Sequence, residues 1–78
     1  MNDYASAYVT QDEVHNENTG FSVTGIDGPK RYMKEHAAYP HSEKTLCGLE
    51  NAQIMRHHFN SDGSFACKDC NQLVSARR

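Results

Sequence analysis

The sequence predicts a small β-rich domain that a bound metal ion stabilises, built from β-hairpins and a short C-terminal helix. The chain has 78 residues, of which 37% are hydrophobic and none is Trp, so its core is too small to offset chain entropy without a further stabilising device. Short stretches alternate polar and apolar side chains, which is the pattern of half-buried strands. Cys67 and Cys70 have two residues between them, a spacing that lets both thiolates reach one metal ion.

Acidic residues dominate the N-terminal part of the chain. Residues 1–29 carry five Asp and Glu and no Lys or Arg, whereas residues 30–78 carry eight basic and five acidic residues. The apolar side chains of residues 1–20 are too scattered to form a helix or strand face, so we expect an acidic, flexible N-terminal arm there and the folded domain over residues 21–78. Alternatively, Tyr8 and Val9 add a short edge strand to the domain.

Alternation predicts hairpins at the start of the domain. Phe21 and Val23 alternate with polar residues in the segment 21–26, and Asp27-Gly28-Pro29 predicts a turn. We expect a second strand over residues 30–39, a loop over 40–43 and a returning strand over 44–49. With this loop, His36 lies opposite Cys47 on the neighbouring strand.

The rest of the chain has weaker periodicity. Residues 50–60 fit either a short helix or a strand, and we favour a helix or an irregular loop. Asn60-Ser61-Asp62-Gly63 predicts a turn, and residues 64–66 predict a short strand. The tail predicts a helix for which Asn71 serves as the N-cap.

Three cysteines and five histidines supply the residue types of a zinc site. Cys67 and Cys70 provide two thiolates and Cys47 a third, and a structural zinc takes a fourth ligand to close its tetrahedron. Directly opposed residues on paired strands have Cβ atoms about 4.5 to 5.5 Å apart, so His36, opposite Cys47, is the preferred fourth ligand. The alternatives are His41, followed by His57 or His58.

Other interpretations of the cysteines explain less. An odd number of cysteines argues against a secreted disulfide scaffold. A redox C-x-x-C pair needs a helix N-terminus within a βαβ unit, which this strand pattern lacks. Alternatively, Cys47 is an ordinary buried apolar residue, since free cysteines are often buried. A structural zinc contributes on the order of 10 kcal/mol of apparent binding energy, which solves the stability problem of the small core.

The order of these residues resembles that in small zinc-ribbon-like proteins of bacteriophages and bacteria. A His is followed by Thr45-Leu46-Cys47-Gly48, and then by Cys67-Lys68-Asp69-Cys70 with Leu73 beyond it. The resemblance covers roughly the second half of the chain and implies a zinc-ribbon-like domain over residues 21–78, phage-encoded or bacterial. It implies no single activity, because one fold hosts many functions.

We expect a zinc-binding interaction module that acts in the cytoplasm as a regulator. Its partner is a protein such as RNA polymerase, another component of the transcription machinery or a host regulator. A net charge of −2 disfavours direct nucleic-acid binding. The alternative is a nucleic-acid-binding zinc ribbon, which the Lys and Arg side chains of residues 30–78 together with Tyr32, Tyr39 and Phe59 would suit. A further alternative is an inhibitor whose acidic arm imitates nucleic acid.

We expect neither an enzyme nor a membrane protein. His41 and Glu43 form an H-x-E pair like the one that precedes C-x-x-C in zinc deaminases, but a domain of this size has no room for a substrate pocket beside it. We therefore expect no catalytic residue and no small-molecule substrate. The sequence has no signal-peptide pattern and no apolar run that approaches about 18 residues.

Overall fold

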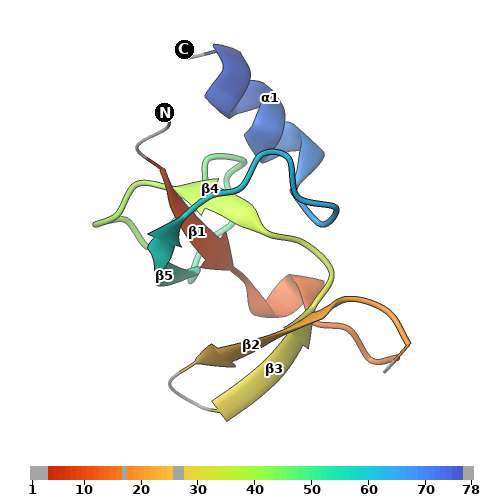
Figure 1. Cartoon of the computed structure of the whole chain (residues 1–78). Helices are drawn as coiled ribbons and strands as arrows, with labels where there is room; N and C mark the ends of the chain where they lie inside the picture. Colours follow the sequence, from red (N-terminus) through yellow and green to blue (C-terminus); the bar gives the residue numbers. More distant parts are fainter. Residues whose placement is uncertain (1–3, 17, 26–27, 77–78) are drawn as a thin grey trace.

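The computed structural model describes residues 4–16, 18–25 and 28–76 (Figure 1). Two antiparallel sheets and one C-terminal helix make up this part of the chain, so the predicted β-rich class with a terminal helix is confirmed. One sheet has the strand order β4-β1-β5 and the other pairs β2 with β3. The elements are β1 (Ala5–Tyr8), the 3-10 helix η1 (Thr10–Asp12), β2 (Phe21–Gly25), β3 (Gly28–Tyr32), β4 (His36–Ala38), β5 (Gln53–His58) and α1 (Lys68–Ala76).

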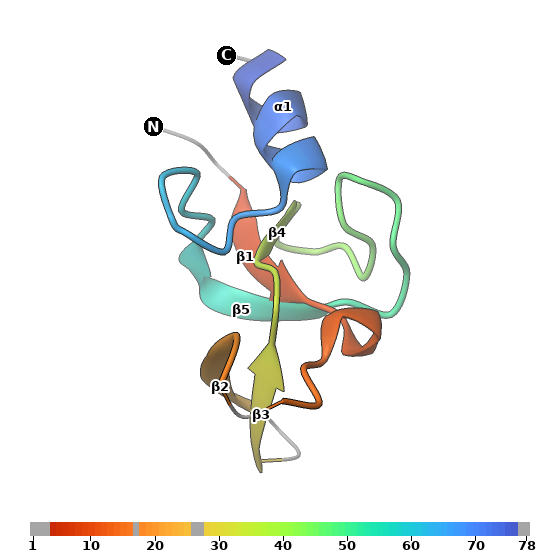
Figure 2. The ribbon, with the colours of Figure 1, turned by 90° about the vertical axis from the view of Figure 1, so that its right-hand side faces the viewer.

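The three-stranded sheet lies in the middle of the molecule. Figures 1 and 2 show α1 at one end of this sheet and the β2-β3 hairpin at the other. Among the described residues, no helix is long and apolar enough to cross a membrane.

β1 is the central strand, although its sequence was expected to form part of an arm. It pairs antiparallel with β4 on one side and with β5 on the other, and residues 5–9 are all buried. The prediction of a flexible arm over residues 1–20 is therefore wrong for this segment. The strand Ala5–Tyr8 contains two Ala and one Ser, whose small side chains fit between two neighbouring strands but carry no hydrophobic period.

The first predicted hairpin is confirmed. β2 pairs with β3 from Phe21↔Tyr32 to Gly25↔Gly28, and the residues between the strands, including Asp27 of the predicted turn, lie outside the described residues. The strand expected over residues 30–39 is divided in two, because β3 ends at Tyr32 and β4 begins four residues further on, at His36. The ring of Tyr8 packs at 5.2 Å from that of Tyr32 and joins the two sheets.

The returning strand over residues 44–49 is reduced to one bridge. Ala38 pairs with Thr45, and the Leu46 amide donates to the Ala37 carbonyl at 2.8 Å. This is the predicted register, but the chain then turns away, with the Gly48 amide bonded to the Thr45 carbonyl at 3.1 Å. Gly48 has φ +101°, a conformation that glycine adopts at little cost.

Residues 53–58 form strand β5, so the helix or loop favoured for this segment is wrong. β5 pairs Tyr8↔Gln53 and Ala7↔Ile54, with a shift of register further along. The predicted turn after β5 is confirmed by a hydrogen bond of 3.1 Å from the Gly63 amide to the Asn60 carbonyl. The short strand expected at 64–66 is only a parallel bridge to residue 35.

α1 begins earlier than predicted, at Lys68. The Asn71 amide donates to the Cys67 carbonyl at 2.9 Å, so Asn71 lies inside the first turn rather than at its cap. Two groups of buried side chains complete the core. The group between α1 and the sheet consists of Ala37, Phe59, Cys67, Cys70 and Val74, and the group within the sheet consists of Ala7, Val9, Ala38 and Ala52.

Candidate metal site

The structure brings together the four residues that the sequence predicted as metal ligands. One ligand atom each from His36, Cys47, Cys67 and Cys70 lies within 4.8 Å of the other three. In a tetrahedron with metal–sulfur bonds of about 2.3 Å, ligand atoms stand roughly 3.8 Å apart, so a small contraction would close this group around one ion. The four residues are therefore close enough to hold a metal ion.

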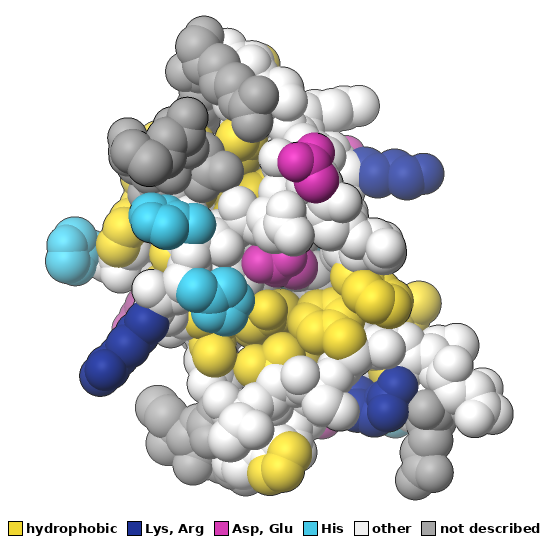
Figure 3. All heavy atoms as spheres, viewed as in Figure 1, with side chains coloured by type: hydrophobic (Ala, Val, Ile, Leu, Met, Phe, Trp, Pro, Cys, Tyr) yellow, Lys and Arg dark blue, Asp and Glu magenta, His cyan; other side chains and the backbone are white. Residues whose placement is uncertain are grey.

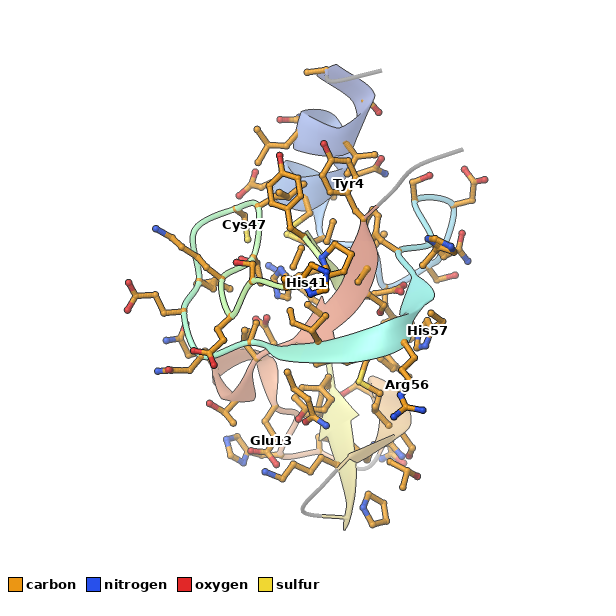
Figure 4. All side chains as sticks on the ribbon, turned by 90° about the vertical axis from the view of Figure 1, so that its left-hand side faces the viewer. Tyr4, Glu13, His41, Cys47, Arg56 and His57 are labelled. Atoms are coloured by element: carbon orange, nitrogen blue, oxygen red, sulfur yellow. The ribbon has the colours of Figure 1, made fainter. Side chains whose placement is uncertain are left out.

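Two of the ligands come from β4 and the loop that follows it. His36 is the first residue of β4, and the bridge between Ala38 and Thr45 sets Cys47 opposite it. The Thr45 hydroxyl lies 3.1 Å from the Cys47 Sγ and accepts a hydrogen bond of 3.0 Å from the Leu49 amide. These bonds hold the loop so that Cys47 lies beside α1 (Figure 4).

The other two ligands lie at the start of α1. The Cys67 amide donates to the Glu35 carbonyl at 2.8 Å, which fixes Cys67 next to the residue before His36. Cys70 follows in the first turn of the helix, and its Sγ lies 3.9 Å from the Ala37 carbonyl oxygen. Cys67 is 4% exposed and Cys70 is fully buried, so neither has the accessible thiol that a redox pair needs.

The two nitrogens of His36 have different partners. Nδ1 lies 3.4 Å from the Cys47 Sγ and 3.7 Å from the Cys70 Sγ, so it is the nitrogen that faces the ion site. Nε2 bonds to a carboxylate oxygen of Asp12. Metal-ligating histidines donate their second N–H to a carboxylate in this way, which fixes the tautomer and makes the other nitrogen a better ligand.

Asp12 was not among the residues that the sequence predicted for the site. This residue lies at the end of η1, in the segment assigned to the arm, and 24 positions separate it from His36. No local spacing connects the two residues. Only a general rule could have pointed to Asp12. A buried ligating histidine needs an acceptor for its second N–H, and the acidic N-terminal segment supplies acceptors.

The buried thiols favour a cation in their midst. Burial, with smaller contributions from the neighbouring Cys47 and Cys67 side chains, raises the pKa of the Cys70 thiol to about 12. A raised pKa keeps the thiol protonated. A bound divalent cation would reverse this effect, since the charge of the ion deprotonates a coordinating thiol.

The other histidines are not part of this group. His41, His57 and His58 are exposed, and the ligand group within the described residues contains none of them. Figure 4 shows His57 projecting from β5, away from Cys47. The choice of His36 over its alternatives therefore agrees with the geometry. No protein-family model matches the chain, and no curated protein or solved structure matches it.

Proposed function

We propose that this chain is a zinc-stabilised interaction module that regulates a protein partner. The observation that carries the proposal is the convergence of three sulfurs and one imidazole nitrogen within 4.8 Å. Thiolate and imidazole ligands favour zinc over calcium and magnesium, which prefer oxygen, and zinc takes this donor set in a tetrahedron. Asp12 supplies the outer carboxylate of such a site.

A structural role fits this donor set better than a catalytic one. Catalytic zinc keeps one coordination position open for water or substrate, whereas four protein ligands fill the tetrahedron. Cys67, Cys70 and His36 are buried, so solvent has little access to the ion. Glu43 of the H-x-E pair is exposed on the loop after β4, and His41 lies outside the ligand group. We therefore propose no enzymatic activity.

A protein partner is supported by apolar side chains that the fold leaves on the surface. Met33 is 54% exposed, Tyr39 50% and Phe65 41%. Met33 and Phe65 line the same surface pocket. Exposed large apolar groups that adjoin one another in this way mark interaction sites more often than single scattered ones do. We propose that the protein partner is a component of the transcription machinery.

The acidic segment does not support the nucleic-acid-mimic alternative. Residues 5–9 are buried in the sheet, and Asp12 is already bonded to His36. Deletion of residues 1–20 would remove the central strand, so loss of binding after such a deletion would not identify a binding arm.

Metal content tests the zinc part of the proposal. We expect native mass spectrometry to find one zinc per chain, lost in His36→Ala and in Cys67→Ser. His41→Ala is the matched control and should retain the metal, because His41 lies outside the ligand group. A wild-type chain that is cooperatively folded and carries no metal would contradict the proposal.

Capture from cell lysate by the zinc-loaded chain tests the interaction part. We expect a specific protein that remains bound after nuclease treatment. Recovery of nucleic acid alone would instead favour the nucleic-acid-binding alternative.

A further inference from the structure

A pocket of about 280 Å³ opens where the two sheets meet. Its walls include Tyr8 of β1, Phe21 of β2 and Phe65 from the turn before α1, and Glu35 provides a carboxylate. His57 and His58 of β5 lie at its side. Figure 3 shows hydrophobic, acidic and histidine side chains adjoining on this face of the molecule. We call this site the Glu35 pocket.

The aromatic rings form a continuous wall. The Tyr8 and Phe21 ring centroids are 5.4 Å apart, and those of Phe21 and Phe65 are 4.9 Å apart. Tyr8 is 5% exposed and Phe65 41%, so the wall leads from the core to the surface. Aromatic faces carry the negative part of the ring quadrupole and attract cations that lie over them.

Glu35 is held in a fixed position beside this wall. Its Oε2 accepts a hydrogen bond of 2.6 Å from the Ser6 hydroxyl and lies 3.5 Å from the Asn60 amide. Its own amide donates to the Phe65 carbonyl at 2.7 Å, which ties the carboxylate to the aromatic wall.

Glu35 has no Lys or Arg beside it in the pocket, whose only basic lining residues among those described are His57 and His58. Burial raises the pKa of Tyr8, a hydrogen bond with Ser6 lowers it, and the nearby Glu35 carboxylate raises it by a smaller amount. A ligand with a positive, flat group matches both the carboxylate and the aromatic wall, whereas a phosphate is repelled by the carboxylate.

We propose that the Glu35 pocket binds the guanidinium group of an arginine side chain on the protein partner. The planar group stacks on the exposed ring of Phe65 and donates to the Glu35 carboxylate, a combination that the compact ammonium of lysine makes less well. This inference rests on the proposed interaction function and identifies the surface that performs it.

Nuclear magnetic resonance of the zinc-loaded chain tests the pocket with a defined probe. We expect blocked arginine, N-acetylarginine methylamide, to shift the amide signals of Phe21, Glu35 and Phe65 at millimolar concentrations. Blocked citrulline is the matched control, since it has nearly the same shape and no charge. Equal shifts with both probes would overturn the proposal, because the carboxylate would then play no part.

Substitutions separate the carboxylate from the ring. Glu35→Gln keeps an acceptor for Ser6 and Asn60 but removes the charge, and it should weaken the arginine probe by about tenfold or more. Glu43→Gln removes an exposed acidic group elsewhere and should leave binding unchanged. Phe65→Leu should also weaken binding of the arginine probe. For each variant, the zinc content and a dispersed NMR spectrum show whether the protein is folded.

The outcomes distinguish this inference from the proposed function. If Glu35→Gln still captures the protein partner as well as the wild-type chain does, the pocket proposal is wrong and the interaction module stands. If a single-stranded oligonucleotide shifts the signals of Phe21 and Phe65 while blocked arginine does not, the ring wall binds nucleobases and the proposal is overturned.

Discussion

At the scale of single residues, the metal site depends on how His36 is oriented. Its side chain is buried, with Nδ1 toward the sulfurs of Cys47 and Cys70 and Nε2 on the Asp12 carboxylate. A histidine that turned freely would have to lose rotamer entropy on binding the ion. The bond to Asp12 therefore holds the His36 imidazole in the orientation that metal binding would need.

Removal of this carboxylate should weaken the site without changing its ligands. We expect Asp12→Ala to lower zinc affinity by about 10- to 100-fold, the usual effect of losing an outer partner of a ligating histidine. Competition with a coloured chelator measures the change. Asp62→Ala, at an exposed turn position, should keep wild-type affinity. An unchanged affinity in Asp12→Ala would show that the bond does not support the ligand.

Because of Tyr8, the free energy of unfolding should fall at alkaline pH. The folded pKa of Tyr8 is raised above its ordinary value of 10.0, mainly by burial, whereas in the unfolded chain the phenol ionises near that value. As pH rises through about 10, the unfolded state loses this proton first, so the free energy of unfolding falls. Denaturant titration on either side of pH 10 should show a smaller decline in Tyr8→Phe than in the wild-type chain, and an equal decline would contradict this account.

Two glycines at positive φ should respond differently to the same substitution. Gly48 (φ +101°) has open space where a Cβ would lie, so Gly48→Ala should cost about 1 to 2 kcal/mol from backbone strain alone. At Gly20 (φ +81°) the new Cβ would lie 2.5 Å from the Tyr32 carbonyl oxygen, so Gly20→Ala should cost more. Thermal unfolding of the zinc-loaded variants measures both costs, and the reverse order would contradict the geometry.

At the scale of elements, the sequence predicted the parts whose pattern is local. β2 was found because Phe21 and Val23 alternate with polar residues, and its hairpin partner follows immediately. The position of His36 beside Cys47 was predicted because a short loop sets the register of the two residues, and one bridge in that register is enough. These predictions needed only neighbouring segments of the chain.

Elements that depend on distant segments were missed. β1 has no hydrophobic period, and its position follows from pairing with β4 and β5, about 30 and 50 residues further along. β5 contains Ile54, Met55 and two histidines in an order that suits a helix as well as a strand, so pairing with β1 decides its form. The bond from Asp12 to His36 is equally non-local.

Hydrogen exchange tests the unexpected strand. We expect the amides of Ala5–Tyr8 that pair with β4 and β5 to exchange as slowly as the best-protected amides of the domain, because a central strand opens only when the sheet unfolds. A flexible arm would exchange at the rate of an unprotected chain. Fast exchange throughout this segment would contradict the central position of β1.

At the scale of the whole molecule, the metal site joins parts that otherwise share little contact. α1 packs on the sheet mainly through Cys70 and Val74, and the buried group between them also holds Cys67. The remaining buried side chains are mostly small, with Ala7, Ala38 and Ala52 in the second group. So small a core offsets only part of the chain entropy, and we propose that coordination of one ion supplies the rest.

Removal of the ion should therefore unfold the domain as one unit. We expect a strong chelator to abolish the helix signal in circular dichroism and the dispersed amide signals of both sheets together, and added zinc to restore them. Retention of a dispersed sheet spectrum without metal would show that the sheets do not need the site.

The spacing of the ligands also determines when the nascent chain can fold. Cys70 lies 34 positions after His36, and both contribute to the same group. During synthesis, the ribosome must release the start of α1 before the last thiolate can reach the ion. Until then β1 and its neighbours lack the closing candidate ligand, so we expect this domain to fold only after the start of α1 has left the ribosome.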